Sequence, residues 1–197
     1  MKVLGICGSP REGGNTDVLL DKALKGAREG GAETEKIVLN ELRFSPCQEC
    51  ENMPGDGSCI INDDMQLVYK KIEEADVLIL ASPIFFGSLS AQTKMMIDRF
   101  QCLWRAKYIL KSVGMPTKKK KGAFLCVSAG TLEDFFDNAR SIVKNFFATV
   151  GHGYNEEVWC PGVEKKGDIL KKTDLLQTSF ETGKKLAAGH GKVGGTV

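Results

Sequence analysis

Short apolar runs alternate five times along this chain with longer segments in which apolar residues recur every three or four positions. The runs are continuous, which is typical of strands buried on both faces of a parallel sheet. They predict strands at residues 2–7, 35–39, 76–81, 123–127 and 154–159. The longer segments predict helices over about 16–27, 64–74, 90–103, 135–150 and 168–187. Strand–helix alternation of this kind predicts an α/β fold with helices on both faces of the sheet.

Three of these helices carry apolar faces at helical spacing. The faces are formed by Leu20, Leu24 and Ala27, by Met65, Val68 and Ile72, and by Phe135, Ala139, Ile142, Phe146 and Val150. Asp63 or Asp64 is placed to cap the second of these helices. Between the elements, residues 105–121 end in four lysines and are expected to form a mobile, solvated loop. The Gly-rich residues 189–197 are expected to be a flexible tail on one domain over residues 1–188.

Composition and charge exclude several classes of protein. The 197 residues are 42% apolar and 26% charged, as in an ordinary globular domain, and the net charge of +2 does not suggest a nucleic-acid or membrane surface. No apolar run approaches the ~20 residues that span a bilayer. The first residues, MKVLGICGSP, do not have the pattern of a signal peptide. The sequence therefore predicts a cytoplasmic protein.

The loop at residues 8–16, GSPREGGNT, follows the first strand and opens the first helix. Small residues let backbone N–H groups approach an anion, and the helix start adds a positive dipole. Ser9, Asn15 and Thr16 can donate hydrogen bonds, and Arg11 supplies charge. The loop is not a nucleotide-triphosphate P-loop, because Gly8-x4-Gly13 is followed by Gly14-Asn15 in place of Lys-Ser/Thr. It is not a dinucleotide fingerprint, because Gly-x-Gly-x-x-Gly is absent. A phosphate site and a plain strand-to-helix turn both remain open for this segment alone.

Two more loops with small polar residues follow strands, at 82–90 (SPIFFGSLS) and at 128–131 (SAGT). The carboxyl ends of parallel strands share one edge of a sheet, where ligands bind. Phe85 and Phe86 are unusual in a loop, and either contact a flat aromatic ligand or pack beneath the loop as core. A phosphate at one end and a flat, partly polar ring at the other describe flavin mononucleotide (FMN).

With these motifs the chain resembles the flavodoxin-like NAD(P)H-dependent FMN reductases, and most closely their iron–sulfur flavoprotein branch. The matching motifs are GSPREGGNT (8–16), CQEC…GSCIINDDM (47–65) and SPIFFGSLSAQTKMMIDR (82–99), and the resemblance covers residues 1 to about 150. It implies a five-stranded, doubly wound parallel sheet of order 2-1-3-4-5. It also implies an FMN cofactor, with NAD(P)H as the co-substrate in an open cleft above it.

The resemblance implies three groups of FMN-binding residues. Ser9, Arg11, Asn15 and Thr16 match the phosphate loop; Pro83, Ile84, Phe85, Phe86, Gly87 and Ser88 match the ribityl and ring loop; and Ser128, Ala129 and Gly130 match the third loop. Relatives often have tyrosine at position 85, so Phe85 keeps the ring and loses the hydroxyl. No catalytic side chain is assigned, because the chemistry belongs largely to the flavin. Lys94 and Asp98, at i and i+4, are interpreted as structural or interface residues.

Six of the seven cysteines fall into two groups, and Cys160, which follows Trp159, is uninformative alone. Cys7, Cys102 and Cys126 lie in apolar segments and are expected to be reduced core residues. The cluster of Cys47, Cys50 and Cys59 suggests metal or redox chemistry in a cytosolic chain.

The iron–sulfur branch binds a [4Fe–4S] cluster with four cysteines, and the resemblance implies Cys47, Cys50 and Cys59 as ligands. Met53 stands at the third cysteine position, and a thioether is a poor iron ligand beside thiolates. Three alternatives remain open here: a lost cluster, a cluster with a substitute fourth ligand, or a zinc site or Cys47–Cys50 disulfide.

The leading hypothesis is an FMN-dependent oxidoreductase that passes electrons from NAD(P)H to flavin, quinone or another small acceptor. The alternatives are an iron–sulfur electron-transfer protein with a ferredoxin-type partner, and a flavin-binding regulator or storage protein. Relatives assemble as homodimers or homotetramers, and the same is expected here. Met95, Met96 and Phe100 then either face a second copy or pack within the monomer.

Overall fold

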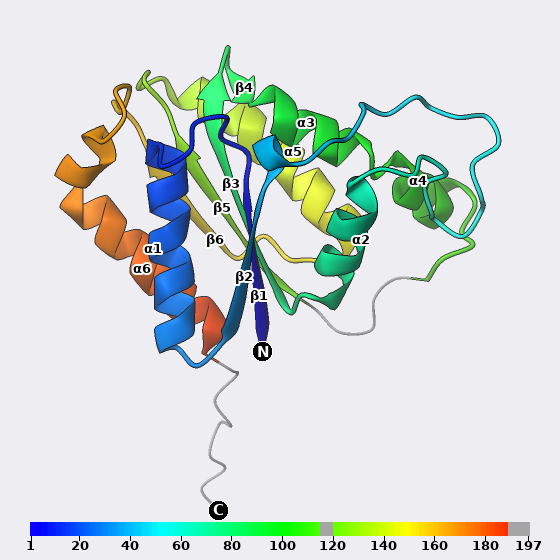
Figure 1. Cartoon of the computed structure of the whole chain (residues 1–197), viewed down its shortest axis with the longest axis horizontal. Helices are drawn as coiled ribbons and strands as arrows, with labels where there is room; N and C mark the ends of the chain where they lie inside the picture. Colours follow the sequence, from blue (N-terminus) through cyan, green and yellow to red (C-terminus); the bar gives the residue numbers. More distant parts are fainter. Residues whose placement is uncertain (115–119, 189–197) are drawn as a thin grey trace, which may run out of the picture.

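Five parallel strands form the centre of the fold in a computed structural model that describes residues 1–114 and 120–188. The strands are β1 (Lys2–Cys7), β2 (Glu33–Val38), β3 (Val77–Phe85), β5 (Lys121–Val127) and β6 (Glu156–Cys160). Their order is β2-β1-β3-β5-β6 (Figure 1), which confirms the predicted order 2-1-3-4-5. A short strand, β4 (Ser88–Leu89), pairs antiparallel with the end of β3.

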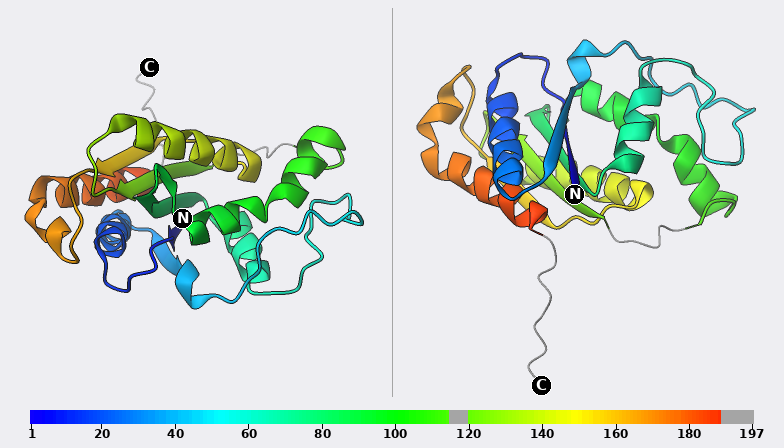
Figure 2. Two further views of the ribbon diagram at one scale, coloured as in Figure 1. Left: turned by 90° about the horizontal axis from the view of Figure 1, so that it is seen from above. Right: turned by 60° about the horizontal axis from the view of Figure 1, so that its bottom comes forward.

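Helices cover both faces of this sheet, and each face has its own apolar core. The helices α1 (Asn15–Glu29) and α6 (Thr173–Ala187) lie side by side on one face (Figure 2). The helices α2 (Met65–Glu74), α3 (Ala91–Asp98) and α5 (Glu133–Val150) pack on the other face. Gly26 and Gly183 let α1 and α6 touch, because a Cβ on Gly183 would lie 1.8 Å from the carbonyl oxygen of Ala23.

The helix predicted over 90–103 is broken, and this corrects the prediction. Here α3 ends at Asp98, α4 (Gln101–Trp104) follows, and a π-helical turn (Arg105–Ile109) continues into the segment predicted to be a loop. The carbonyl oxygen of Arg99 accepts a 2.8 Å hydrogen bond from the hydroxyl of Tyr69. This carbonyl is therefore turned towards α2 at the break. Together with residues 43–64, α4 lies beyond α2 and away from the sheet (Figure 1).

Two details of the predicted core change. Phe136 is buried in α5 and stacks between Phe124 and Trp159, whereas Phe135, which was predicted to be on the apolar face, is 42% exposed. The stripe that faces the sheet continues through Ala139 and Val143, so Phe135 falls to one side of it. Met96 and Phe100 are buried within the monomer.

Three further predictions concern the buried cysteines, membrane-spanning segments and the segments expected to be mobile. Cys7, Cys102 and Cys126 are buried as expected, and Cys160 is buried as well. Within the described residues, no helix is long and apolar enough to cross a membrane. Part of the predicted loop, residues 115–119, and the whole predicted tail, residues 189–197, lie outside the described residues.

Candidate functional site

Three connections meet at the edge of the sheet where the parallel strands end (Figure 1). They are the loop from β1 to α1, the β3–β4 hairpin and the loop from β5 to α5. The neighbouring strands hold them together, because β3 pairs with β1 on one side and with β5 on the other. The N–H of Gly8 donates a 2.8 Å hydrogen bond to the carbonyl of Ala81, which fixes the first loop against β3. The fold therefore brings together the three loops that the sequence singled out.

The first loop opens α1 without a side-chain cap. The first-turn N–H groups of a helix have no intrahelical acceptor, so those of Asn15, Thr16 and Asp17 are directed to the loop. Ser9 and Thr16 are buried beside them. Gly13 has a φ of +60°, and the N–H of Gly14 donates to the carbonyl of Arg11 at 3.0 Å. Donors converging on a helix N-terminus form a cradle suited to a phosphate.

Asn15 has a positioning role that the sequence did not reveal. Its Oδ1 accepts hydrogen bonds from the N–H groups of Gly167 and Ile169, at 3.0 and 3.3 Å, and its Nδ2 donates to the carbonyl of Lys165 at 2.8 Å. Asn15 thus ties the β6–α6 connection to the first loop. That connection brings Lys166 close, with Nζ donating to the carbonyl of Glu12 at 2.8 Å. Lys166 adds a second cation to the Arg11 of the first loop. The Lys-Lys-Gly run at 165–167, after the last strand, was the signal in the sequence that could have pointed to it.

The carboxylate of Asp17 lies in the same cradle and is neutralised by a lysine from β2. Asp17 accepts a hydrogen bond from the N–H of Gly13 at 2.9 Å, and its other oxygen is 2.5 Å from Nζ of Lys36. Partial burial opposes the charge on Lys36, but Asp17 and Asp21 raise its pKa above the ordinary value. Lys36 therefore offsets an anion that would otherwise repel a phosphate.

The segment predicted as the second loop is largely a β-hairpin. Residues Ser82–Phe85 belong to β3, and Phe85 pairs with Ser88 across a two-residue turn of Phe86 and Gly87. Both turn residues have positive φ, +49° and +72°, as a type I′ turn requires. The alternative that both phenylalanines pack as core is wrong, because Phe85 is 44% exposed and Phe86 is fully exposed at 110%.

A buried hydroxyl network joins the base of this hairpin to the first loop. Oγ of Ser90 donates to the carbonyl of Gly8 at 2.6 Å and lies 2.8 Å from Oγ1 of Thr93, which in turn contacts Oγ of Ser82 at 3.2 Å. A Cβ on Gly8 would lie 1.8 Å from Oγ1 of Thr93. Sequence reasoning missed Ser90 and Thr93, although both stand in the quoted motif.

The third loop begins at Ser128, which is buried, and continues through the exposed Ala129 and Gly130. Oγ of Ser128 donates to the carbonyl of Gly130 at 2.8 Å, and its N–H donates to the carbonyl of Cys160 at 3.0 Å. These bonds form a tight turn beside the hairpin.

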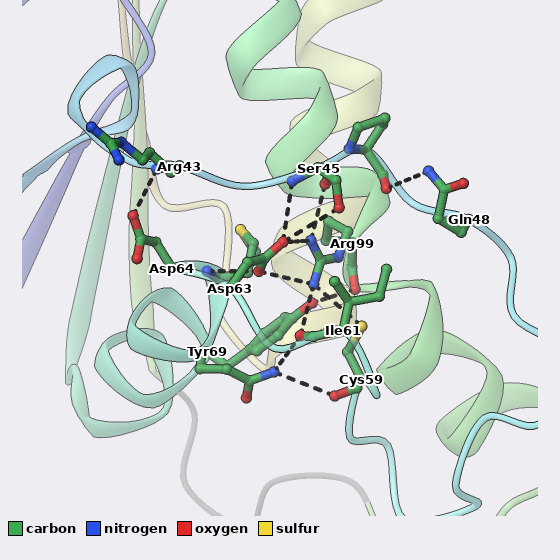
Figure 3. Close-up of polar contacts among 12 residues, drawn as sticks. Arg43, Ser45, Gln48, Cys59, Ile61, Asp63, Asp64, Tyr69 and Arg99 are labelled. Atoms are coloured by element: carbon green, nitrogen blue, oxygen red, sulfur yellow. Dashed lines mark hydrogen bonds and ion pairs between the residues drawn. The ribbon is translucent and has the colours of Figure 1, made fainter.

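Arg99 is a buried cation that the sequence analysis did not identify. Its side chain is 0% exposed and lies among the residues that lead into α2 (Figure 3). Two of its nitrogens contact the carboxylate of Asp63, at 2.6 and 3.2 Å. The guanidinium also donates to the carbonyls of Ser45 and Ile61, and Nη2 lies 3.4 Å from Sγ of Cys59. The Arg99 side chain therefore holds the ends of the cysteine loop together.

The contacts around the Arg99 guanidinium lower the pKa of two neighbouring groups, the Asp63 carboxyl and the Cys59 thiol. Burial raises the pKa of Asp63, but hydrogen bonds from Arg99 and from the backbone of Ser45 and Met65 leave it below its usual value. Burial likewise raises the pKa of Cys59. The backbone N–H of Ile61 and the Arg99 guanidinium lower it by more, so the pKa of this thiol lies below its usual value. Asp63 also accepts a 3.1 Å hydrogen bond from the N–H of Met65, so the predicted capping at this helix start falls to Asp63.

Two of the three candidate cysteine ligands, Cys47 and Cys59, line different cavities. Cys47 and Met53 line a cavity of about 620 Å³ beside Trp104, whereas Cys59 lines another of about 610 Å³ beside Tyr69. Within residues 1–114 and 120–188, no group of three or more His, Cys, Asp or Glu residues is placed to hold a metal ion. Three thiols and a thioether also do not fit a [4Fe–4S] cluster with four cysteine ligands.

The sheet order and the three loops at its carboxyl edge define a flavodoxin-like α/β protein. The family model for NADPH-dependent FMN reductases matches residues 1–149, and the chain belongs to this family of oxidoreductases.

Relatives and solved structures agree with that assignment. An iron–sulfur flavoprotein of Methanocaldococcus jannaschii is 35% identical over 95% of this chain and 96% of its own length. An iron–sulfur flavoprotein of Methanosarcina thermophila is 38% identical over 57% of this chain and 59% of its own. The structure of an NAD(P)H:quinone oxidoreductase from Methanothermobacter marburgensis has the same fold, with a TM-score of 0.73 and 21% identity, covering 96% of this chain and 98% of that one.

Proposed function

We propose that this chain binds FMN at the three loops and uses it to pass electrons from NAD(P)H to a small acceptor. The observation that carries the proposal is the uncapped start of α1, where first-turn N–H groups lie with the buried hydroxyls of Ser9 and Thr16 and with the cation of Lys166. The exposed Arg11, whose Nη1 donates to the carbonyl of Glu164 at 3.3 Å, adds a second positive charge from the same loop. This donor set fits a phosphate monoester. The hairpin and the third loop lie beside it and offer room for a ring and backbone donors.

The residues divide into three roles. Ser9, Arg11 and Thr16 contact the phosphate, and Asn15 positions the connection that carries Lys166. Residues 83–88, from Pro83 through Ile84, Phe85, Phe86 and Gly87 to Ser88, hold the ribityl chain and one side of the ring. Ser128, Ala129 and Gly130 hold the other side through backbone groups.

FMN, when bound, supplies the hydride and electron chemistry. The chain itself orients the ring, fixes the phosphate and provides N–H donors near the ring. No side-chain acid or base is required of it, and we assign none.

The phosphate assignment is tested by comparing FMN with riboflavin, which lacks the phosphate. Ser9→Ala and Thr16→Val should each weaken FMN binding about tenfold or more, because a hydrogen bond to a charged group contributes ~1.5–3 kcal/mol. Riboflavin affinity should stay within about twofold. Thr34→Val, in β2, is the matched control. Equal losses for FMN and riboflavin, or no loss for either, would contradict the assignment. Steady NAD(P)H oxidation with an added acceptor separates the enzyme from a storage or regulatory protein.

The second candidate is an iron–sulfur electron-transfer protein, which the names of the two relatives favour. Its weakness here is Met53. Met53→Cys should increase the iron and sulfide bound on anaerobic reconstitution and add a broad brown absorbance to the two flavin bands. If the parent chain already binds four irons, the lost-cluster alternative is wrong and electron transfer to a ferredoxin-type partner becomes the leading role.

We also propose a cytoplasmic homodimer or homotetramer. Trp104, Tyr108 and Ile109 are exposed together on α4 and the π-helical turn, next to the Lys94–Asp98 ion pair of α3. Large exposed apolar groups at one place favour a protein interface. Light scattering of the parent chain and of Trp104→Arg tests this, and a monomeric parent would contradict it.

A further inference from the structure

The cavity of about 610 Å³ beside Tyr69 is lined by no residue of the three loops. It lies against α2 and α4, which are on the other side of the molecule from the β3–β4 hairpin (Figure 1). Its size falls within the ~300–1,000 Å³ of small-molecule sites. Much of its wall is apolar and is formed by Ile72, Phe100, Leu103, Val113 and Val150. The molecule therefore has room for a second small ligand with an apolar body.

Lys107 brings a cation to this cavity. It lies in the π-helical turn Arg105–Ile109, a kind of turn that is rare and occurs frequently at functional sites. Its Nζ donates a 2.6 Å hydrogen bond to the carbonyl of Thr149, near the end of α5. An ammonium has three N–H donors, and within the described residues the other two have no acceptor. Two donors of a partly buried cation are therefore left for a ligand.

The charges around Lys107 favour an anion. Burial lowers the pKa of Lys107, and no carboxylate among residues 1–114 and 120–188 offsets that effect. Lys120 lines the same cavity, and after burial the charges of Lys120 and Lys107 help to lower the pKa of the nearby His152. The acidic residues of the lining, Asp56 and Glu73, are exposed to solvent, where their charge is screened. The cavity thus combines an apolar wall with an uncompensated positive charge.

We infer that this cavity binds a small hydrophobic monocarboxylate. The carboxylate accepts hydrogen bonds from the two remaining N–H donors of Lys107, and the apolar body is buried against Phe100 and Leu103. The site is separate from the three loops, so it does not depend on the proposed binding of FMN.

Isothermal titration calorimetry with 2-naphthoate and the uncharged 2-naphthamide tests this inference, with and without added FMN. The parent chain should bind 2-naphthoate about tenfold more tightly than 2-naphthamide, because hydrogen bonds between charged groups are stronger than neutral ones. Lys107→Met should remove that preference and leave the affinity for 2-naphthamide within about twofold. Lys107→Gln should do the same while keeping a donor for Thr149, and Lys107→Arg should retain the preference. Lys70→Met, which removes an exposed lysine of α2 outside the cavity, is the matched control.

A second measurement locates the ligand. Cys59 lines this cavity, whereas Cys47 lines the other one. Bound 2-naphthoate should therefore slow the alkylation of Cys59 by iodoacetamide and leave the rate at Cys47 unchanged.

Equal affinities of the parent chain for the two ligands, or equal losses in the Lys107→Met and Lys70→Met variants, would overturn the inference. An unprotected Cys59 would also overturn it. Loss of 2-naphthoate binding on addition of FMN would do the same, because it would place the ligand at the three loops. A chain that binds 2-naphthoate in this way but binds no FMN would instead reject only the proposed function.

Discussion

Arg99 and Asp63 form a two-point ion pair beneath the cysteine loop, with Nη1 2.6 Å from Oδ2 and Nη2 3.2 Å from Oδ1. The Arg99 side chain has no exposure to water and Asp63 has little. Removing one member of a buried pair leaves the other charge uncompensated, which typically costs ~3–5 kcal/mol. We therefore expect Arg99→Met to lower the free energy of unfolding by about 3 kcal/mol in urea titrations.

The double variant Arg99→Met with Asp63→Asn is the control for this pair. It should lose less stability than the sum of the two single variants, because it leaves neither charge alone. Additive losses would mean that the two side chains do not stabilise each other.

Cys59 should react as a thiolate at lower pH than an ordinary thiol. The Ile61 N–H and the Arg99 guanidinium lower its pKa despite partial burial, so the thiolate persists as the pH falls. Alkylation with iodoacetamide, followed peptide by peptide in a mass spectrometer, should reach half its maximal rate at a lower pH in the folded chain than in the same chain in guanidinium chloride. Identical half-points would exclude the effect.

His152 should make the fold sensitive to mild acid. Burial, together with the charge of Lys120, lowers its pKa to about 4 from an ordinary 6.5, so the folded chain holds the neutral ring. Between these values the unfolded chain binds more protons, and stability therefore falls as the pH drops. From pH 7.5 to pH 5 the loss from this group should be about 2 kcal/mol. His152→Asn should show a correspondingly shallower pH dependence in urea unfolding, and an equal dependence would rule out this histidine as the cause.

Gly8 should tolerate no side chain. An added Cβ would lie 1.8 Å from Oγ1 of Thr93, so Gly8→Ala should cost ~1–3 kcal/mol through overpacking and should weaken FMN binding by moving the first loop. Adding Thr93→Ala should recover part of the stability. Gly114→Ala is the matched control, because no atom lies within 4 Å of its added Cβ. Equal stability of the Gly8 and Gly114 variants would contradict the packing described for the first loop.

Particular residues show how far the sequence could predict the site. The small residues of 8–16 and the loops after the third and fourth predicted strands are visible as local patterns, and parallel strands place them at one edge. Thr93 and Lys166 are not visible in this way. They reach the first loop from positions 80 or more residues away, and only the packing of α3 and of the β6–α6 connection brings them there.

Local sequence patterns therefore predicted one part of the structure, and contacts between distant residues decided the rest. The continuous apolar strands and the helical periods determined the α/β class and the five parallel strands, because these depend on patterns within each segment, whereas the order of the strands was implied only by the resemblance to a known family. Only the tertiary structure shows that the 82–90 segment is a hairpin with Phe86 exposed. It also shows that α3 ends just before Arg99, whose carbonyl accepts a hydrogen bond from the Tyr69 hydroxyl. The buried Arg99 guanidinium contacts both Asp63 and Cys59. Each of these features depends on contacts between groups that are far apart in the sequence. The free energy of such a contact cannot be predicted from any single segment of the chain.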